Sequence, residues 1–564
     1  MAHMGRWIIA ALTVLAVAVS LRARCVRIAH GPRRPWLPLA VRSRLRMRAG
    51  PGWAGRWQVW RAHGLPAART VARHARPSLA RKHRPLGGWQ EYATFLGWAQ
   101  GWLVRLRAYA HLESLILMIA APQDGKTQLA AGHVIDAPGP VVATSIREDL
   151  VRATAGLRAQ KGRVHIWSPE AVGDFASTFS WNIVHGCGDI AVAVRRAGYM
   201  IEAVAGKGLA DERFWDDQAS LVLAAYLHAA ALAGGDMRAV HAWITRDDDI
   251  PLRILDTCPG AWAAARDHIG LYLSLGDKPR QSISVTLARV LKFMQLPACA
   301  RSVITPDGGP GFDFAAFITS SDTLYLVAAD GATSPVPPLF AAIIAELAHA
   351  ALQARARLDP PLTAVLDEVA NIAPVPVAAW SSWAAGSGVL LRVIAQSYAQ
   401  LRQRWGADGA AVIWQCCKTK VIFGGTSEDE LAAMVERACG TVRVRTASRD
   451  GRGRRRGHED IPLLPAAALR MLPAGRAVII QGRAAPVVVR VEQVRRRGDY
   501  KHYQRHRSRG LAPVLPASAP AQLAVGKPAL PAAASLPTVR DEPAVRHDRK
   551  ATAPHGAGEP GGGL

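Results

Sequence analysis

Short apolar runs recur along this chain and alternate with longer stretches in which hydrophobic residues follow a helical period. The runs are rich in Val, Ile and Leu and end at polar residues, Gly or Pro, which is typical of buried strands in a parallel sheet. Strands are predicted at 115–120, 141–144, 164–167, 323–327, 362–366, 389–395, 420–423 and 477–481. Because helices separate these strands, the pattern predicts an α/β fold with a doubly wound, mostly parallel sheet.

Between residues 191 and 296 the pattern changes, and helical periodicity dominates, as it does in 214–230. This stretch lacks the β-rich runs that flank it, so an all-helical insertion at 191–296 between strands of one sheet is the simplest organisation. We therefore expect residues 87–190 and 297–494 to form a single α/β domain.

The first apolar run, residues 7–21, is 15 residues long and uninterrupted. At about 1.5 Å per residue it spans roughly 22 Å, less than the roughly 30 Å of a hydrocarbon core. Its length also fits a signal peptide, but Arg-rich sequence follows it where a small-residue cleavage site would stand. Dense Arg on this side favours a single-pass anchor within residues 1–30 in the cell membrane, with the bulk of the chain cytoplasmic. A start further upstream, with more membrane sequence, stays open.

Charge points to polyanionic partners, because the formal net charge is +27 and the isoelectric point about 10.7. No Asp or Glu precedes Glu91. The basic segment 31–86 is expected to lie along an anionic membrane surface, with a solvated arm as the alternative. GC-rich coding also produces an excess of Arg, so composition alone does not select the partner. Residues 495–564 turn basic and then rich in Pro, Ala and Gly, which predicts a disordered tail.

Several other features are interpreted as structural. The seven cysteines form no CxxC pair, which favours reduced core residues of a cytosolic protein over a zinc site or a disulfide framework. Trp167, Trp215 and Trp383 are interpreted as core aromatics and not as stacking platforms for bases. The Arg-rich run 443–456 is expected to be a loop, either solvated or in contact with nucleic-acid phosphates.

The apolar run at 115–120 leads into the sequence APQDGKT at 121–127. In a P-loop of this kind, backbone N–H groups and the Lys bind phosphates, and the Thr hydroxyl completes the Mg²⁺ shell. The residues that match these roles are Pro122, Gln123, Asp124, Gly125, Lys126 and Thr127. The full pattern has Gly where this chain has Ala120, and Asp124 puts a carboxylate where phosphates arrive. Such short strings also occur by chance, so the motif depends on its context.

A second predicted strand, 362–366, runs directly into Asp367 and Glu368. Asp367 can hold Mg²⁺ through water, and Glu368 can orient and deprotonate an attacking water. Gln396 follows the strand at 389–395, where its amide can sense a γ-phosphate. A solvated strand end is the alternative for each residue. A P-loop and a strand-terminal Asp-Glu pair in one chain nevertheless predict a protein that binds ATP and Mg²⁺.

An ordered series of segments across roughly residues 90–495 resembles the conjugative type IV coupling proteins, the TraG/TraD-like DNA-transfer ATPases, in a form typical of actinobacteria. The series consists of YATFLG at 92–97, APQDGKT at 121–127, APGPVVATS at 137–145, TLYL at 323–326, LDEVAN at 366–371, AQSYAQL at 395–401 with Trp405 and Gly406, IFGG at 422–425, PLLP at 462–465 and LP at 472–473. The order of the whole series is far more specific than any one motif.

The resemblance implies a membrane-anchored, RecA-like P-loop ATPase with a small all-helical domain, assembled as a homo-hexamer. Such proteins receive a relaxase-bound DNA strand and pass it to a type IV secretion channel. By position, the resemblance assigns phosphates and Mg²⁺ to Lys126 and Thr127, the metal to Asp367, the water to Glu368 and the γ-phosphate to Gln396.

The chain departs from the family pattern at Ala120 and Asp124 of the P-loop. It also carries Ala385 and Ser387 where basic residues usually precede the Gln-bearing strand, which leaves a trans-acting arginine finger without a candidate. Arg392 lies inside the strand and is a poor substitute. Two alternatives therefore stand beside a DNA-transfer motor: a non-hydrolysing membrane platform that recruits the relaxosome, and a DNA or protein translocase outside conjugation.

Overall fold

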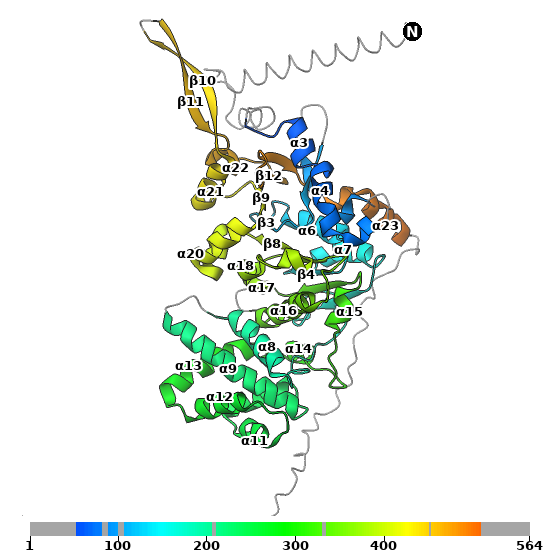
Figure 1. Cartoon of the computed structure of the whole chain (residues 1–564), viewed down its shortest axis with the longest axis vertical. Helices are drawn as coiled ribbons and strands as arrows, with labels where there is room; N and C mark the ends of the chain where they lie inside the picture. Colours follow the sequence, from blue (N-terminus) through cyan, green and yellow to red (C-terminus); the bar gives the residue numbers. More distant parts are fainter. Residues whose placement is uncertain are drawn as a thin grey trace, which may run out of the picture. The chain divides into compact units, whose positions relative to one another are not determined.

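The computed structural model describes residues 52–81, 88–99, 106–205, 210–329, 334–450 and 453–508. Within these residues an 11-stranded sheet forms the centre of the fold, with the strand order β2-β1-β13-β12-β9-β3-β8-β7-β4-β6-β5 (Figure 1). All eight strands predicted from the apolar runs are present. They are β3 (Ile116–Ile119), β4 (Val141–Ser145), β5 (Val164–Trp167), β6 (Thr323–Val327), β7 (Leu362–Leu366), β8 (Val389–Ala395), β9 (Thr419–Phe423) and β12 (Arg476–Gln481).

Strands β9, β3, β8, β7, β4, β6 and β5 pair in parallel. The remaining edge is antiparallel: β12 pairs with β9, and β13 (Val487–Arg490), β1 (Ala93–Ala99) and β2 (Leu106–His111) continue from it. The fold is therefore a mixed α/β sheet with a mostly parallel centre, as the sequence predicts. Both faces of the parallel strands are buried, which explains why these strands read as continuous apolar runs.

Successive residues of β3 enter two different cores, because side chains alternate across a strand. Ile116 and Met118 belong to the core under α6 (Lys126–Asp136) and α7 (Asp149–Arg158). Leu117 and Ile119 belong to the core that includes α16 (Pro337–Gln353). Further helices accompany the later strands. They are α15 (Phe314–Ile318), α17 (Val369–Ile372), α18 (Val377–Trp380), α19 (Ala384–Ser387), α20 (Tyr398–Cys416), α21 (Asp429–Cys439) and α22 (Ala466–Arg470).

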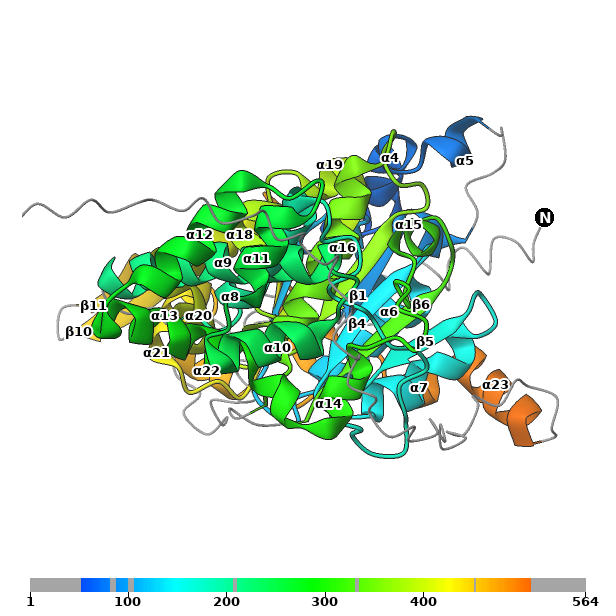
Figure 2. The ribbon, with the colours of Figure 1, turned by 90° about the horizontal axis from the view of Figure 1, so that it is seen from below.

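A group of helices lies between β5 and β6 in the chain, and Figure 2 shows α8 to α13 gathered together. The helices are α8 (Ile190–Glu202), α9 (Ala210–Leu232), α10 (Met237–Arg246), α11 (Ile250–Thr257), α12 (Ala263–Ser274), α13 (Asp277–Val290) and α14 (Pro297–Ser302). Buried ion pairs attach the group to the α/β layers. Arg195 Nε of α8 lies 2.9 Å from Glu346 Oε1 of α16, and Arg196 Nη2 lies 3.2 Å from Glu346 Oε2. We refer to this group as the helical insertion.

The amino-terminal part of the described chain packs on the protein, and contact of this basic segment with headgroups stays a prediction. Residues 52–81 contain α3 (Arg56–Ala62), α4 (Leu65–Ala75) and α5 (Pro77–Arg81). His63 is fully buried, and its ring nitrogens lie 3.0 Å from Gln481 Oε1 and 2.9 Å from Ala485 O. Arg76 pairs with Asp359 and Glu91. Ala and Val residues between the arginines form the face that contacts the rest of the protein. The number of charges in the segment does not predict this face.

The predicted anchor at 7–21 lies outside the described residues. Among the residues that are described, no helix combines the length and apolar character needed to cross a membrane.

The run 443–456 is not a loop, and this expectation is wrong. Strands β10 (Thr441–Asp450) and β11 (Gly453–Pro462) pair antiparallel over ten residues each, forming the hairpin labelled in Figure 1. Cross-strand pairing explains the difference. Val442 lies opposite Ile461, and Arg443 forms an ion pair with Asp460 at 2.9 Å, so the two strands stabilise each other.

Order also continues beyond 495, where the sequence analysis places the start of a disordered tail. Helix α23 (Gly498–Ser508) packs against α7, and the buried Tyr503 fills the space above Gly156, where a Cβ would meet its Oη at 2.0 Å. Arg497 donates from Nη1 and Nη2 to the Asp136 carboxylate at 2.8 and 2.6 Å. A buried, bidentate ion pair therefore holds this basic segment against α6.

Replacing Arg497 by Ala should lower the thermal midpoint by several degrees. The change leaves the Asp136 carboxylate buried without its partner, at a cost of about 3–5 kcal/mol. Thermal unfolding followed by circular dichroism measures this. The neighbouring Arg495→Ala removes the same charge from an exposed position and should leave the midpoint nearly unchanged. An equal effect of both variants would show that the loss of charge matters and the pair does not.

Candidate nucleotide-binding site

The phosphate loop connects the end of β3 to the start of α6. Its backbone turns through two residues in the left-handed region, Gln123 with φ 67° and Gly125 with φ 102°. Both ends of the loop are fixed, because Ala120 N donates to Ala395 O of β8 at 3.2 Å and Gly475 N donates to Asp124 O at 3.0 Å. The first N–H groups of a helix have no acceptor within the helix, so the start of α6 directly after this loop suits an anion.

The carboxylate pair, Asp367 and Glu368, lies directly after the end of β7. Asp367 and Glu368 are 4% and 1% exposed. Thr144 Oγ1 of the adjacent β4 donates to Asp367 O at 2.7 Å, and Glu368 N donates to Asp367 Oδ1 at 3.0 Å. Glu368 has φ 51°, a conformation that costs a non-glycine residue about 1–3 kcal/mol and is found mainly where surrounding contacts enforce it. The strand end therefore holds Glu368 in one defined direction.

Four of the predicted site residues meet at the carboxyl ends of β3, β7 and β8. Lys126 Nζ contacts Glu368 Oε1 directly and lies 3.7 Å from Asp367 Oδ1. Gln396 Nε2 donates to the same Glu368 oxygen at 2.7 Å. The chain thus gathers an ammonium group, two carboxylates and an amide into one largely buried cluster, which we call the lysine–carboxylate cluster.

The other predicted residues lie on the phosphate loop. Thr127 is half-buried in the first turn of α6, directly after Lys126, while Pro122 and Gln123 are exposed. Asp124 is half-buried beside Gly425, where an added Cβ would lie 2.9 Å from its Oδ2. Burial raises the pKa of the Asp124 carboxyl. Its carboxylate is therefore a poorly solvated group at the edge of the loop.

Two further residues support the cluster, and no sequence motif predicts them. Asn371 Nδ2 donates to Glu368 Oε2 at 3.3 Å, a contact that its spacing of three residues along a short helix could have suggested. Thr144 could not be found in this way, because only the pairing of β4 with β7 brings it near Asp367.

Arg392 is 1% exposed and donates to Ser114 O at 2.7 Å and Thr94 Oγ1 at 2.9 Å, so its role is structural.

Protonation controls what this cluster can bind. Burial raises the pKa of Asp367 to about 6; the Lys126 charge opposes this shift and the Glu368 charge adds to it. Above this pH the carboxylate is ionised and can act as a ligand for a hard cation, whose preferred ligands are carboxylate and hydroxyl oxygens. Asp367 and the Thr127 hydroxyl belong to that class.

The sheet and the charged cluster at its strand ends define a mixed α/β fold with a mostly parallel centre. Comparison with solved structures agrees. The bacterial conjugative coupling protein TrwB in an unbound form superposes with a TM-score of 0.55 and 16% identity, over 68% of this chain and 85% of that chain. TrwB in complex with ADP and Mg²⁺ gives 0.52 and 17% over 68% and 85%. TrwB with a non-hydrolysable ATP analogue gives 0.51 and 17% over 69% and 88%.

The sequence itself carries a family match. Residues 361–474, which include Asp367, Glu368 and Gln396, match the family described as the TraM recognition site of TraD and TraG. Among curated proteins, none matches this chain. The family match and the shared fold confirm the resemblance to conjugative type IV coupling proteins.

Binding of Mg²⁺–ATP should weaken as the pH falls below about 6, because a proton then occupies Asp367 in competition with the metal. Calorimetric titrations between pH 5 and 8 test this in wild type and Asp367→Asn, since the variant reports the titration of the nucleotide itself. Wild type should bind more tightly than the variant above pH 6 and lose this advantage below it. A constant ratio of the two affinities across the range would contradict a metal role for Asp367.

Proposed function

We propose that this chain is a membrane-anchored, ATP-driven coupling protein that delivers relaxase-bound single-stranded DNA to a type IV secretion channel during conjugation. The observation that carries the proposal is the lysine–carboxylate cluster, found at the sheet edge of a fold shared with TrwB. The family match over residues 361–474 supports the same assignment.

In this proposal the phosphate loop holds ATP. Backbone N–H groups of 123–125 and the Lys126 ammonium bind the β- and γ-phosphates, and Thr127 and Asp367 hold Mg²⁺, which neutralises phosphate charge. The solved complexes of TrwB with ADP and Mg²⁺ and with an ATP analogue support binding of this ligand class. Glu368 accepts a proton from the attacking water, and Gln396 senses the γ-phosphate.

Lys126 has two competing partners in this scheme. Without nucleotide, its ammonium group neutralises Glu368 and Asp367. Phosphate oxygens carry more charge, so a bound nucleotide draws the ammonium group away from Glu368. Glu368, still oriented by Gln396 and Asn371, is then available as a base only when ATP is present.

The remaining parts of the architecture complete the proposal. An anchor at 7–21 holds the chain in the cytoplasmic membrane, where the basic flank contacts anionic lipid. The helical insertion forms a separate all-α domain, and six copies assemble as a ring around DNA. Relaxosome proteins and secretion-channel components are the partners that a coupling protein requires.

A non-hydrolysing platform is the second candidate. Asp124 favours it, because a half-buried carboxylate with a raised pKa borders the phosphate loop. Ala120 and Ala385 favour it as well, since both depart from the family pattern. Such a platform would bind the relaxosome and the membrane without turnover of ATP.

Substituting Glu368 by Gln distinguishes the motor from the platform. It removes the base but keeps the size of the side chain, so DNA-stimulated ATP hydrolysis should fall at least about 100-fold while ATP still binds. Steady-state hydrolysis with and without single-stranded DNA measures the first effect, and calorimetry the second. Glu430→Gln, which alters an exposed acid on α21, is the matched control. If wild type and Glu368→Gln turn over ATP equally slowly in the presence of DNA, the motor is excluded and the platform remains.

A further inference from the structure

Helix α3 exposes aromatic side chains on the side where a surface helix usually presents polar residues. Trp57 and Trp60 are 64% and 48% exposed, and no large hydrophobic side chain in the described part of the chain is more exposed than Trp57. Their rings stack, with centroids 4.8 Å apart and planes inclined by 29°. Two adjacent exposed indoles form an apolar patch of the kind that marks an interaction surface.

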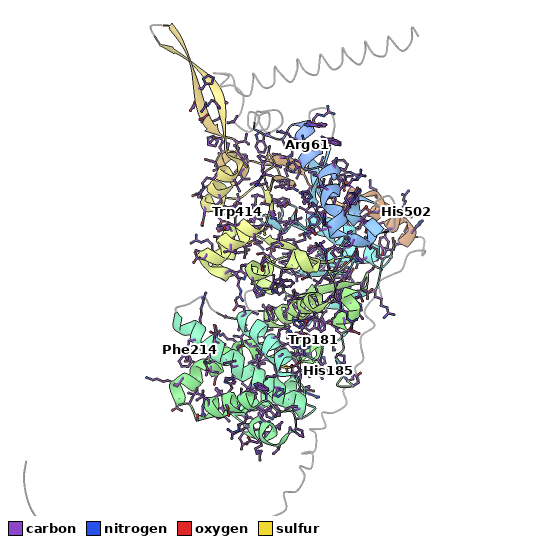
Figure 3. The ribbon with its side chains drawn as sticks, in the orientation of Figure 1. Arg61, Trp181, His185, Phe214, Trp414 and His502 are labelled. Atoms are coloured by element: carbon purple, nitrogen blue, oxygen red, sulfur yellow. The ribbon has the colours of Figure 1, made fainter. Side chains whose placement is uncertain are left out.

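Arginines border this pair on both sides. At about 100° per residue, the order around the helix is Arg56, Trp60, Trp57, Arg61, and the four positions cover an arc of about 140°. All four side chains are exposed, and Figure 3 labels Arg61 near α3. Val59 lies outside this arc and is 3% exposed, in the core under α6 and α7. The outer face of α3 is therefore apolar in the middle and cationic at both edges.

The sheet holds α3 at both of its ends. Before the helix, Trp53 is 6% exposed, and Ala54 N donates to Pro486 O at 3.0 Å. After the helix, His63 is fully buried and its Nδ1 lies 3.0 Å from Gln481 Oε1 of β12. The exposed face thus belongs to a fixed helix, so a partner binds it without the cost of ordering a loose segment.

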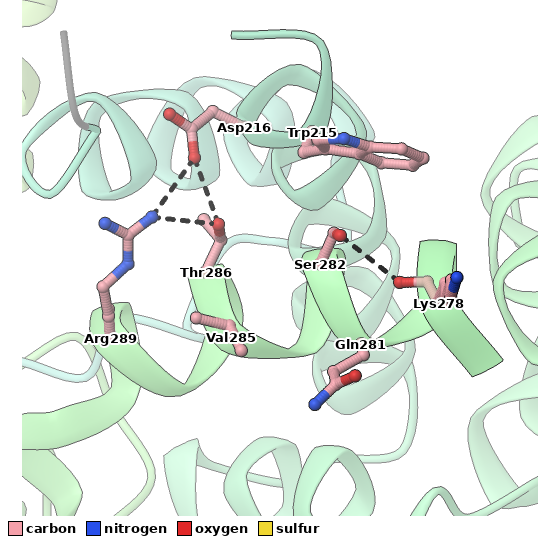
Figure 4. A pocket seen from close by; sticks show the side chains of 8 residues that line it. All are labelled: Trp215, Asp216, Lys278, Gln281, Ser282, Val285, Thr286 and Arg289. Atoms are coloured by element: carbon pink, nitrogen blue, oxygen red, sulfur yellow. Dashed lines mark hydrogen bonds and ion pairs between the residues drawn. The ribbon is translucent and has the colours of Figure 1, made fainter. Parts of the chain in front are cut away.

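Other tryptophans lie in different surroundings. Trp167 is fully buried, which confirms it as a core aromatic. Trp215 is half-buried: it packs against the main core and also lines an open cavity between α9 and α13 (Figure 4). Trp262 of the helical insertion is 57% exposed, but Arg266, one turn further along, pairs with the acids Asp256 and Asp267. An exposed indole with such a neutralised neighbour is a suitable control for α3.

The position of α3 in the chain indicates what covers it. Only residues 22–55 separate the helix from the apolar run at 7–21, and no Asp or Glu precedes Glu91. A further cation, Arg483, is exposed in the turn between β12 and β13, the turn whose Pro486 bonds to Ala54. The charge around α3 is therefore complementary to an anionic surface close to a membrane anchor.

A bilayer surface matches both kinds of side chain on this face. Indole rings favour the headgroup region, where the apolar ring is covered and the N–H stays near polar groups. Arginine stems lie along apolar surface while their guanidinium groups reach phosphates, and anionic lipid adds a favourable potential. A protein partner would need an apolar groove with an acid at each edge to satisfy the same four residues.

We propose that the outer face of α3 docks on anionic phospholipid, with Trp57 and Trp60 in the headgroup region and Arg56 and Arg61 paired with lipid phosphates. The inference rests on the proposed function, which places the chain at the membrane. It adds a second point of contact beyond the anchor. This contact holds the α/β domain against the bilayer in one orientation.

The test uses the full chain with the photoreactive residue p-benzoylphenylalanine in place of Trp57, reconstituted with bilayers of phosphatidylcholine and phosphatidylglycerol. Photolysis should attach lipid to the peptide that contains residue 57, measured by mass spectrometry. The same substitution at Trp262 is the matched control and should yield at least about tenfold less lipid adduct. Because α3 needs only the surface of a bilayer, the adduct tests the contact whether or not the anchor inserts.

The charge of the face is tested with the same label. Arg56→Gln combined with Arg61→Gln should lower the lipid adduct at position 57 at least about threefold in the anionic bilayers, because each cation near such a surface favours binding. Lys278→Gln removes an exposed charge from the helical insertion, drawn in Figure 4, and should leave the adduct unchanged.

Equal lipid adducts at positions 57 and 262, or an adduct that does not depend on the two arginines, would overturn the assignment. Adducts to a second protein chain in place of lipid would overturn it too and identify α3 as a protein interface. The proposed function fails by a different result, namely the absence of DNA-stimulated ATP hydrolysis in the wild-type chain.

Discussion

The contact between Lys126 and the carboxylates after β7 depends on one constraint, the parallel pairing of β3, β8 and β7. In this arrangement Ile119 lies beside Ala395, and Leu366 lies beside Val393, so all three strands end at the same edge. The loops that follow must then share the space above that edge. A phosphate loop, an Asp-Glu pair and a Gln from distant parts of the chain are brought together by this register.

Burial gives the cluster its chemical character. Lys126 and the two carboxylates are almost inaccessible to water, so their mutual attraction is stronger than on the surface and removal of any one charge is costly. The strained backbone at Glu368 and the bonds from Gln396 and Asn371 fix the carboxylate before any ligand arrives. In the proposed function, such a site responds to nucleotide by exchanging the partner of one lysine, with little movement of the rest.

The sequence predicts the parallel strands and the residues at their ends because both signals are local: an apolar run and the polar residues directly after it. It predicts far less where stability comes from contacts distant in the chain. The hairpin β10–β11 depends on pairs such as Val442 with Ile461, and α23 depends on Arg497 with Asp136. In both segments a basic composition suggests a loop or disorder, while a few long-range contacts produce order. The half-buried state of Trp215 likewise depends on where α13 packs against α9.

The proposed function requires the lysine–carboxylate cluster to be a nucleotide site. Calorimetric titration of Mg²⁺–ATP into the wild-type chain and into Lys126→Met tests it most directly, since Met keeps the length of the side chain and removes its charge. The wild type should bind, and the variant should lose at least about tenfold in affinity, because the phosphates lose their point charge. Equal affinities, or no binding by the wild type at pH 7, would contradict it.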